Sequence, residues 1–178
     1  NFMNSREYES SLTANETIEA TVVFMDICSF TTISENETPD TVVKLLNKYF
    51  DVMVKQVIEH KGHVDKFIGD AVMAVFRGKT HLESAIQASL AVRNEIDKLP
   101  EEAEKVNFRP HVSIGINTGE MISGNIGSAD LRRLDYTVIG DTVNTAQRLQ
   151  SAAKPGQIKK KKKTYGKVKD TFNCKYVG

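Results

Sequence analysis

The sequence contains no apolar run near the ~18–20 residues of a membrane-spanning helix, and no signal-peptide pattern opens it. Its two cysteines, Cys28 and Cys174, are too few for a disulfide framework and suit a reducing compartment. We therefore expect a cytoplasmic protein, or the cytosolic domain of a larger, membrane-attached one. The chain begins Asn1-Phe2-Met3 and ends at Gly178 in mid-pattern, which favours a segment of something larger.

A basic excess is also lacking. The chain has 24 Lys and Arg against 23 Asp and Glu, and the run Lys159–Lys163 supplies five of the basic residues. Without that run, 19 basic residues stand against 23 acidic ones. Because nucleic-acid binders usually cluster basic residues on one face, this distribution predicts no nucleic-acid partner.

The composition is that of one globular domain. Hydrophobic residues make up 40% and charged residues 26% of 178 residues, close to the average for folded domains. Residues 1–18 are polar and without strong periodicity, so we expect a linker or tail there. Residues 19–178 are expected to form the folded domain.

Alternating strand and helix patterns fill the first half of the domain. Residues 20–24 predict a buried strand that delivers Asp26 at its end, followed by a Ser/Thr-rich loop at 28–34. Thr38 and Pro39 predict the start of a helix, in which apolar residues recur at Val42, Leu46, Tyr49, Met53 and Val57. Residues 64–68 and 71–76 predict two strands joined by the turn Gly69-Asp70, and 82–99 a second amphipathic helix.

The second half predicts a hairpin at residues 112–124 around Asn117-Thr118-Gly119, a strand at 135–139 and a helix at 141–152. Helices that return to a sheet containing antiparallel hairpins indicate an α+β fold, with helices packed on a mostly antiparallel sheet.

Two aspartates stand out by their position. Asp26 follows an apolar strand, and Asp70 lies at the tip of a predicted hairpin. Two converging carboxylates would suit a hard divalent cation such as Mg²⁺, which binds one or two carboxylates plus substrate phosphates. Alternatively, Asp70 is a favoured turn residue and Asp26 a strand-ending cap.

Three motifs, in order, favour the metal-binding interpretation. They are Phe24-Met-Asp26-Ile-Cys-Ser-Phe30-Thr31, Lys66-Phe-Ile-Gly-Asp70 and Tyr136-Thr-Val-Ile-Gly-Asp-Thr-Val-Asn144-Thr-Ala-Gln-Arg148-Leu. Together with Gly115-Ile-Asn-Thr-Gly119 they resemble the catalytic domain of class III nucleotide cyclases, and the match runs from Ala20 to Gln157. Ordered motifs are far more specific than any one alone.

The resemblance implies a ferredoxin-like βαββαβ core and a head-to-tail dimer with active sites in the cleft between the two chains. It implies that Asp26, Asp70 and the carbonyl of Ile27 hold two divalent metal ions, Mg²⁺ or Mn²⁺. The backbone amides of Phe30 and Thr31, at a loop-to-helix turn, would bind the triphosphate, as helix N-termini do.

The resemblance also assigns residues to the partner protomer. Lys66 and Thr137 would contact the base, and Asn144 and Arg148 the ribose and phosphate of the substrate. Asn144 and Arg148 are one helical turn apart, so they share a face. Without the family context, that pair would be interpreted as an exposed polar stripe.

Lys66 and Thr137 favour adenine over guanine. Lysine can only donate, so it fits the N1 acceptor of adenine and opposes the N1–H of guanine; the Thr137 hydroxyl can accept from the 6-amino group. Guanylyl members carry Glu and Cys at these positions. Thr137 resembles the bacterial and soluble subgroup, of which some members respond to bicarbonate. The resemblance thus implies ATP as substrate, cyclic AMP and pyrophosphate as products, and a regulatory domain outside this segment.

Two other functions stay open, a guanylyl cyclase and a catalytically silent nucleotide-binding dimerisation domain.

The lysine run departs from the family, which has an apolar strand there; a charged edge strand, an unreliable sequence and a membrane tether are the alternatives. The chain also stops before the C-terminal hairpin that carries a further phosphate-binding lysine in relatives. Cys28 is expected to be a small buried side chain, with a redox-sensitive thiol as the alternative.

Overall fold

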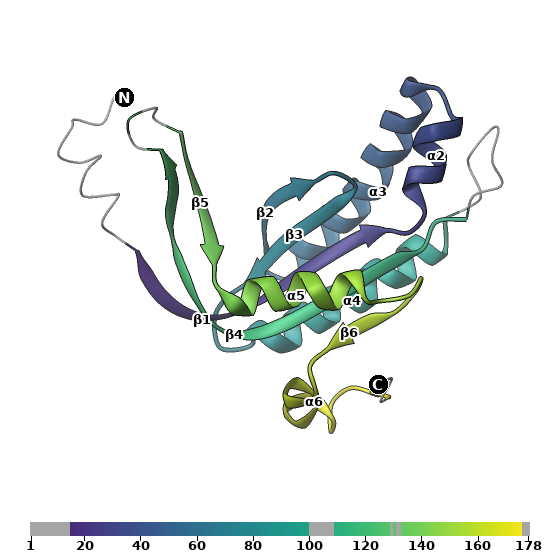
Figure 1. The fold of residues 1–178 in the computed structure, drawn as a ribbon. Coiled ribbons are helices and arrows are strands. Elements are labelled where there is room, and N and C mark those ends of the chain that lie inside the picture. The colour runs from purple at the N-terminus through teal and green to yellow at the C-terminus, as the bar shows by residue number, and fades with distance from the viewer. Residues whose placement is uncertain (1–14, 100–108, 129, 131–132, 176–178) are drawn as a thin grey trace.

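The computed structural model describes residues 15–99, 109–128, 130 and 133–175. A six-stranded sheet carries helices on both faces, and a β-arm projects from one end (Figure 1). The strands are β1 (Glu16–Ile27), β2 (His63–Ile68), β3 (Ala71–Phe76), β4 (Val112–Ser128), β5 (Arg133–Ile139) and β6 (Ile158–Lys160). The helices are α2 (Phe30–Asn36), α3 (Pro39–Glu59), α4 (His81–Asp97), α5 (Asp141–Ser151) and α6 (Lys162–Val168).

The strand order is β2-β3-β1-β4-β5, and β6 pairs with β4. All pairs are antiparallel except β4 with β6. The units β1, α3, β2, β3, α4 and β4 form the expected ferredoxin-like βαββαβ core, which confirms the predicted α+β class. Among the described residues, no helix is both long and apolar enough to cross a membrane.

Alternation along β1 creates two hydrophobic layers. Val23, Met25 and Ile27 face α3 and α4, whereas Val22 and Phe24 belong to a second cluster that includes residues of α5. Successive side chains of a strand point to opposite faces of the sheet, so one apolar run supplies both layers. This buried strand holds Asp26 rigidly near its end.

Helix α3 begins as predicted. The Thr38 hydroxyl accepts a hydrogen bond from the backbone N–H of Thr41, and Pro39 occupies the first turn. The buried positions are Leu45, Tyr49, Met53 and Val57, so Leu45 is buried where Leu46 was expected. Leu46 is only partly buried at the edge of the same core.

The predicted Ser/Thr-rich loop is wrong over most of its length, because α2 occupies residues 30–36. Ser29 precedes the helix in a left-handed conformation, with φ of 61°. The helix buries Phe30 and Ile33, and the Phe30 ring packs edge-on against Tyr49 at 6.4 Å between centroids. Tertiary packing stabilises a turn of Ser and Thr residues that have only weak helix preference of their own.

The predicted hairpin at 112–124 is also wrong, because β4 continues through it. β1 pairs with β4 from Ile27↔Val112 to Glu16↔Ser123, so Asn117, Thr118 and Gly119 have strand partners. Asn117 donates through its amide to the carbonyl of Thr142, and a Cβ on Gly119 would lie 3.0 Å from the Thr142 hydroxyl. The Asn-Thr-Gly segment therefore seats the start of α5 instead of reversing the chain.

The expected boundaries shift at both ends. β1 begins at Glu16, so residues 16–18 belong to the sheet, and residues 1–14 of the predicted tail lie outside the described residues. The lysine run supplies Lys159 and Lys160 to the three-residue edge strand β6, and its last two residues begin α6. A charged edge strand is thus what the structure shows, and such charges protect an edge from further pairing.

Candidate nucleotide and metal site

Asp26 and Asp70 meet at one end of the sheet. Asp26 pairs with Ala71, the residue that follows Asp70. The backbone N–H of Ile27 donates to the carbonyl of Asp70 at 3.5 Å. The turn is tight because Gly69 adopts a φ of 60°, which a glycine tolerates without steric cost.

The electrostatics of Asp26 suit a position that binds a cation. Burial, the charge of Asp70 and a hydrogen bond with Asp70 raise the pKa of Asp26 from 3.8 to about 7. The two carboxyl groups can share a hydrogen bond only while one of them is protonated. Within the described part of the chain, buried Asp26 Oδ1 has no hydrogen-bond donor. Two facing oxygen ligands with such an orphaned atom fit a hard divalent cation.

The donor set is small. Among the described residues, no group of three or more His, Cys, Asp or Glu side chains gathers around a possible metal position. Two carboxylates nevertheless match the way Mg²⁺ is usually held, with the remaining ligands supplied by water and substrate phosphates. Ile27 could contribute only its backbone carbonyl as a ligand, because its buried hydrocarbon side chain has no ligating atom.

Gln150 is a site residue that the sequence did not single out. Its side-chain amide lies 3.4 Å from Asp26 Oδ2 and 2.9 Å from Ser113 Oγ, and the contact lowers the pKa of Asp26 in part. Gln150 follows Val143 and Ala146 on the buried face of α5. A polar residue on an otherwise apolar stripe was the signal that could have revealed it.

Cys28 is partly buried, and not fully buried as expected. Burial raises the pKa of the Cys28 thiol, a hydrogen bond with Ser113 partly offsets this rise, and the charges of Asp26 and Asp70 add to it. A thiol of raised pKa stays protonated near neutral pH and reacts poorly.

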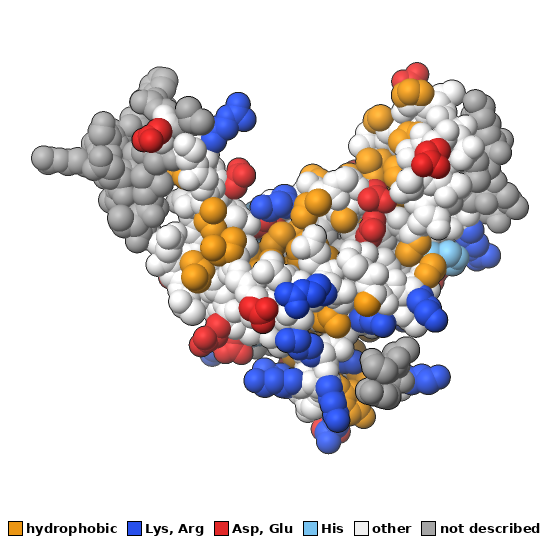
Figure 2. Space-filling model, in the orientation of Figure 1, with side chains coloured by type: hydrophobic (Ala, Val, Ile, Leu, Met, Phe, Trp, Pro, Cys, Tyr) orange, Lys and Arg blue, Asp and Glu red, His pale blue; other side chains and the backbone are white. Residues whose placement is uncertain are grey.

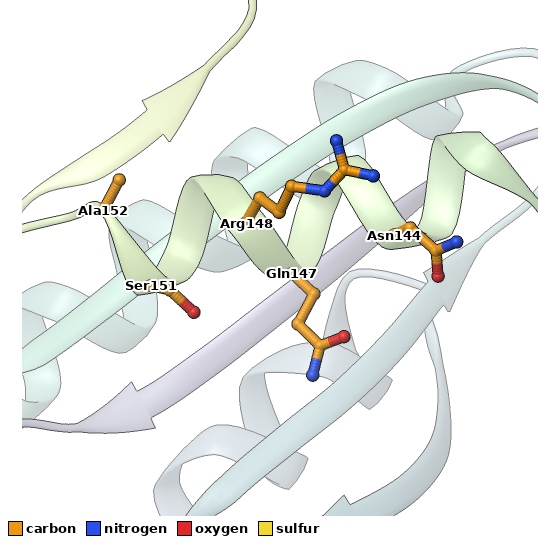
Figure 3. Close-up of a pocket in the computed structure, with 5 residues that line it drawn as sticks. All are labelled: Asn144, Gln147, Arg148, Ser151 and Ala152. Atoms are coloured by element: carbon orange, nitrogen blue, oxygen red, sulfur yellow. The ribbon is translucent and has the colours of Figure 1, made fainter.

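Asn144 and Arg148 lie on the outward face of α5. They line an open groove of about 570 Å³ with Gln147, Ser151 and Ala152 (Figure 3). Arg148 lies 3.9 Å from Asp141, and both side chains are well exposed.

The outward face of α5 does not meet the carboxylates of its own chain. Gln150 follows Arg148 by two residues, which is about 200° around a helix, and Gln150 contacts Asp26. One chain therefore brings Asp26 and Asp70 together but directs Arg148 away from them.

Lys66 and Thr137 come together through a third residue. The Thr137 hydroxyl donates to Asp65 Oδ2 at 2.7 Å, and Lys66 Nζ lies 3.6 Å from the same oxygen. Thr137 belongs to β5 and Lys66 to β2, the two ends of the strand order. The sheet must curl strongly for these ends to touch, and sequence analysis did not identify Asp65.

Phe30 and Thr31 open α2, four and five residues after Asp26. Phe30 is buried and Thr31 is exposed. The first N–H groups of a helix lack partners within that helix. The amides of Phe30 and Thr31 therefore lie in the first turn of the helix that follows the strand carrying Asp26.

Comparison with known proteins agrees with this geometry. The family described as adenylate and guanylate cyclase catalytic domain matches residues 12–178. Adenylate cyclase 1 of Rhizobium meliloti is 37% identical over 142 residues, which cover 76% of this chain and 21% of that protein. An uncharacterized protein of Mycobacterium tuberculosis is 38% identical over 149 residues, or 83% of this chain and 27% of its own length. The chain thus spans about a quarter of these relatives.

Solved structures of both specificities share the fold. The adenylyl cyclase CyaB from P. aeruginosa has a TM-score of 0.81 at 35% identity, covering 88% of this chain and 83% of its own. The guanylyl cyclase Cya2 has a TM-score of 0.77 at 30% identity, covering 85% and 79%. The chain therefore belongs to the adenylate and guanylate cyclase catalytic domain family.

Proposed function

We propose that this chain is an adenylyl cyclase that converts ATP to 3′,5′-cyclic AMP and pyrophosphate. The observation that carries the proposal is the carboxylate pair Asp26 and Asp70, with its orphaned oxygen, in a chain that also presents Lys66 beside Thr137. The first feature supports binding of a metal–triphosphate, and the second supports selection of adenine.

Asp26, Asp70 and the Ile27 carbonyl are proposed to hold two Mg²⁺ or Mn²⁺ ions. Such ions, when bound, would activate the ribose 3′-hydroxyl and neutralise the leaving phosphates. Gln150 keeps the Asp26 carboxylate oriented, because its amide contacts one carboxylate oxygen and is itself held by Ser113. The amides of Phe30 and Thr31 would bind triphosphate oxygens at the start of α2.

Arg148 and Asn144 are proposed to act on the nucleotide held by a second copy of the chain. Arginine remains protonated and offers a planar set of donors for a phosphoryl group. Because α5 directs these two side chains away from the carboxylates of its own chain, a site containing all four residues needs two chains. A homodimer with shared sites meets this requirement.

Exposed apolar side chains support the dimer. Figure 2 shows hydrophobic side chains along a hollow between the β4–β5 arm and the α2–α3 end of the molecule. Phe67 and Ile68 of β2 and Ile122, Tyr136 and Ile139 of the arm are each more than two-fifths exposed. Apolar patches of this kind mark interaction sites.

A guanylyl cyclase is the second candidate, because the guanylyl cyclase Cya2 is a structural relative. Lys66 and Thr137 oppose it, since neither offers the carboxylate that would accept the N1–H of guanine. A silent nucleotide-binding domain is disfavoured, because Asp26, Asp70, Asn144 and Arg148 are all retained. We place the reaction in the cytoplasm, where the two free thiols would stay reduced, and its regulation in a sensor domain outside these residues.

Product analysis with ATP and GTP, each in Mg²⁺ and in Mn²⁺, tests the proposal. Cyclic AMP should form faster than cyclic GMP, and chelation of the divalent ion should stop both reactions. Faster formation of cyclic GMP would overturn the adenylyl assignment. Activity that survives exhaustive chelation would refute the metal role, and absence of any product from a dimeric, folded protein would favour the silent domain.

A further inference from the structure

Asp65 lies at an irregularity of the edge strand β2. The pairing of β2 with β3 slips between Val64 and Lys66, so Asp65 is the extra residue of a β-bulge. Lys66 opposes Met73, which belongs to the hydrophobic cluster shared with α5. Such bulges re-aim side chains and are frequent beside functional sites. Here the bulge lets two consecutive residues, Asp65 and Lys66, contribute to one polar cluster.

The Asp65 side chain is almost completely buried, with 3% of its surface exposed, whereas the Lys66 side chain is 41% exposed. Burial of a carboxylate requires partners for its oxygens. Lys66 provides a cation at 3.6 Å, and Thr137 provides a hydroxyl at 2.7 Å, both to Asp65 Oδ2. The shorter contact is the one to Thr137, which is 72 positions away in the chain.

The chemistry of this contact determines its direction. An ionised carboxylate only accepts hydrogen bonds, and a threonine hydroxyl has one proton and two lone pairs. Since the Thr137 hydroxyl must give its proton to Asp65, it has only lone pairs left for any other group. Asp65 thereby makes Thr137 an obligate acceptor.

We propose that Asp65 sets the purine selectivity of this chain by fixing the hydrogen-bond polarity of Thr137. This inference rests on the proposed base-binding role of Lys66 and Thr137. Asp65 is a positioning residue that acts through Thr137 and does not itself contact the nucleotide. An acceptor at Thr137 matches the 6-amino donor of adenine and opposes the 6-oxo acceptor of guanine.

Without the carboxylate, Thr137 could serve either purine. An asparagine at position 65 can turn its amide group toward the Thr137 oxygen and release the hydroxyl proton for the 6-oxo group of guanine. Thr137→Val keeps the shape of the side chain but removes the hydroxyl altogether. If Asp65→Asn changes purine selectivity only through this hydroxyl, it must have no effect on selectivity in a chain that also carries Thr137→Val.

A double-mutant cycle tests the proposal. The ratio of kcat/KM for ATP to kcat/KM for GTP is measured for the wild type, Asp65→Asn, Thr137→Val and the double variant, in Mn²⁺. Asp65→Asn should lower the ratio by about tenfold in the wild-type background, the size of one mismatched buried hydrogen bond. It should change the ratio by less than about twofold in the Thr137→Val background, because the two residues act as a unit. Asp51→Asn, an exposed position on α3, controls for the loss of a negative charge.

Two results would overturn the role of Asp65 and leave the base-binding assignment standing. In the first, Thr137→Val changes the ATP/GTP ratio but Asp65→Asn does not. In the second, Asp65→Asn lowers the ratio equally in the wild-type and Thr137→Val backgrounds. If Thr137→Val and Lys66→Gln both leave the ratio unchanged, the base-binding assignment is wrong and the Asp65 proposal falls with it. Circular dichroism and thermal unfolding establish that each variant is folded. If Asp65→Asn does not fold, Asp65→Ser, which also removes the carboxylate, takes its place in the same cycle.

Discussion

The side-chain amide of Gln150 lies 3.4 Å from the carboxylate of Asp26, so α5 contacts the end of β1 where the carboxylate pair stands. The same helix presents Asn144 and Arg148 on its opposite, exposed side. One helix therefore contacts the carboxylates of its own chain on one side and leaves Asn144 and Arg148 exposed on the other, where we propose that they act on the nucleotide of a second chain.

Gln150→Leu should weaken metal binding. The change keeps a side chain of similar size but removes the donor that partly lowers the pKa of Asp26, so more of the carboxyl is protonated near neutral pH. The contact is long, and a loss of about 1 kcal/mol, or about fivefold in the Mn²⁺ concentration for half-maximal activity, is expected. The acid limb of the pH–rate profile should also move to higher pH. Gln87→Leu, exposed on α4, is the control, and equal effects of both changes would contradict the role of Gln150.

Without a bound cation, the carboxylate pair Asp26 and Asp70 should make the stability of the protein depend on pH. On folding without metal, the pKa of Asp26 rises from 3.8 to about 7, so the folded state retains a proton that the unfolded state has released. Stability of the metal-free protein should therefore fall as the pH rises through this range.

Asp26→Asn should relieve that penalty. In EDTA at pH 8 the variant should be more stable than the wild type by about 1 kcal/mol, a figure reduced for solvent screening of a partly exposed group. This corresponds to about 2–4 °C in Tm, and the difference should shrink toward pH 4. Mn²⁺ should raise the Tm of the wild type much more than that of the variant. A metal-free variant less stable than the wild type at pH 8 would contradict the electrostatic account.

Lys66→Glu combined with Thr137→Cys should erode the preference for ATP. Glutamate can accept from the N1–H of guanine, whereas adenine N1 loses its donor, and each mismatch costs about 1–3 kcal/mol. The ATP/GTP ratio of kcat/KM should fall at least about tenfold. The new carboxylate would stand beside Asp65, so some loss of stability is also expected, and thermal unfolding measures it. Lys44→Glu on α3 is the matched charge control; an unchanged ratio in the folded double variant would show that neither residue contacts the base.

Mixing two inactive variants tests the shared site. Asp70→Asn and Arg148→Ala each spoil both sites of a homodimer, but a mixed dimer has one cleft with both lesions and one with neither. Random pairing makes half of the dimers mixed, so about a quarter of wild-type activity should return if the sites act independently. Subunit exchange is confirmed with differently tagged chains. No recovery despite exchange would place all the catalytic residues in one chain.

Local patterns were sufficient for much of the fold. The cap at Thr38 and Pro39, the apolar run before Asp26 and the turn at Gly69 and Asp70 all formed where the sequence predicts them. Each depends on neighbours within one helical turn or one hairpin, so the backbone conformation follows from adjacent residues. The ordered motifs around Asp26, Asp70 and Arg148 likewise identified the family before any contact was known.

Tertiary structure alone decided the remaining features, because each depends on a partner that is distant in the chain. Asn117, Thr118 and Gly119 stay in β4 instead of turning, since β1 supplies a strand partner on one side and Thr142 packs against the other. The seven residues of α2 are helical because the core receives Phe30 and Ile33. Gln150 reaches Asp26, and Asp65 reaches Thr137, only after the sheet has curled and α5 has packed on it. The sequence alone thus determined which residues were available for the chemistry. Long-range packing determined which of them meet, because burial and hydrogen bonding stabilise contacts between residues that are far apart in the sequence.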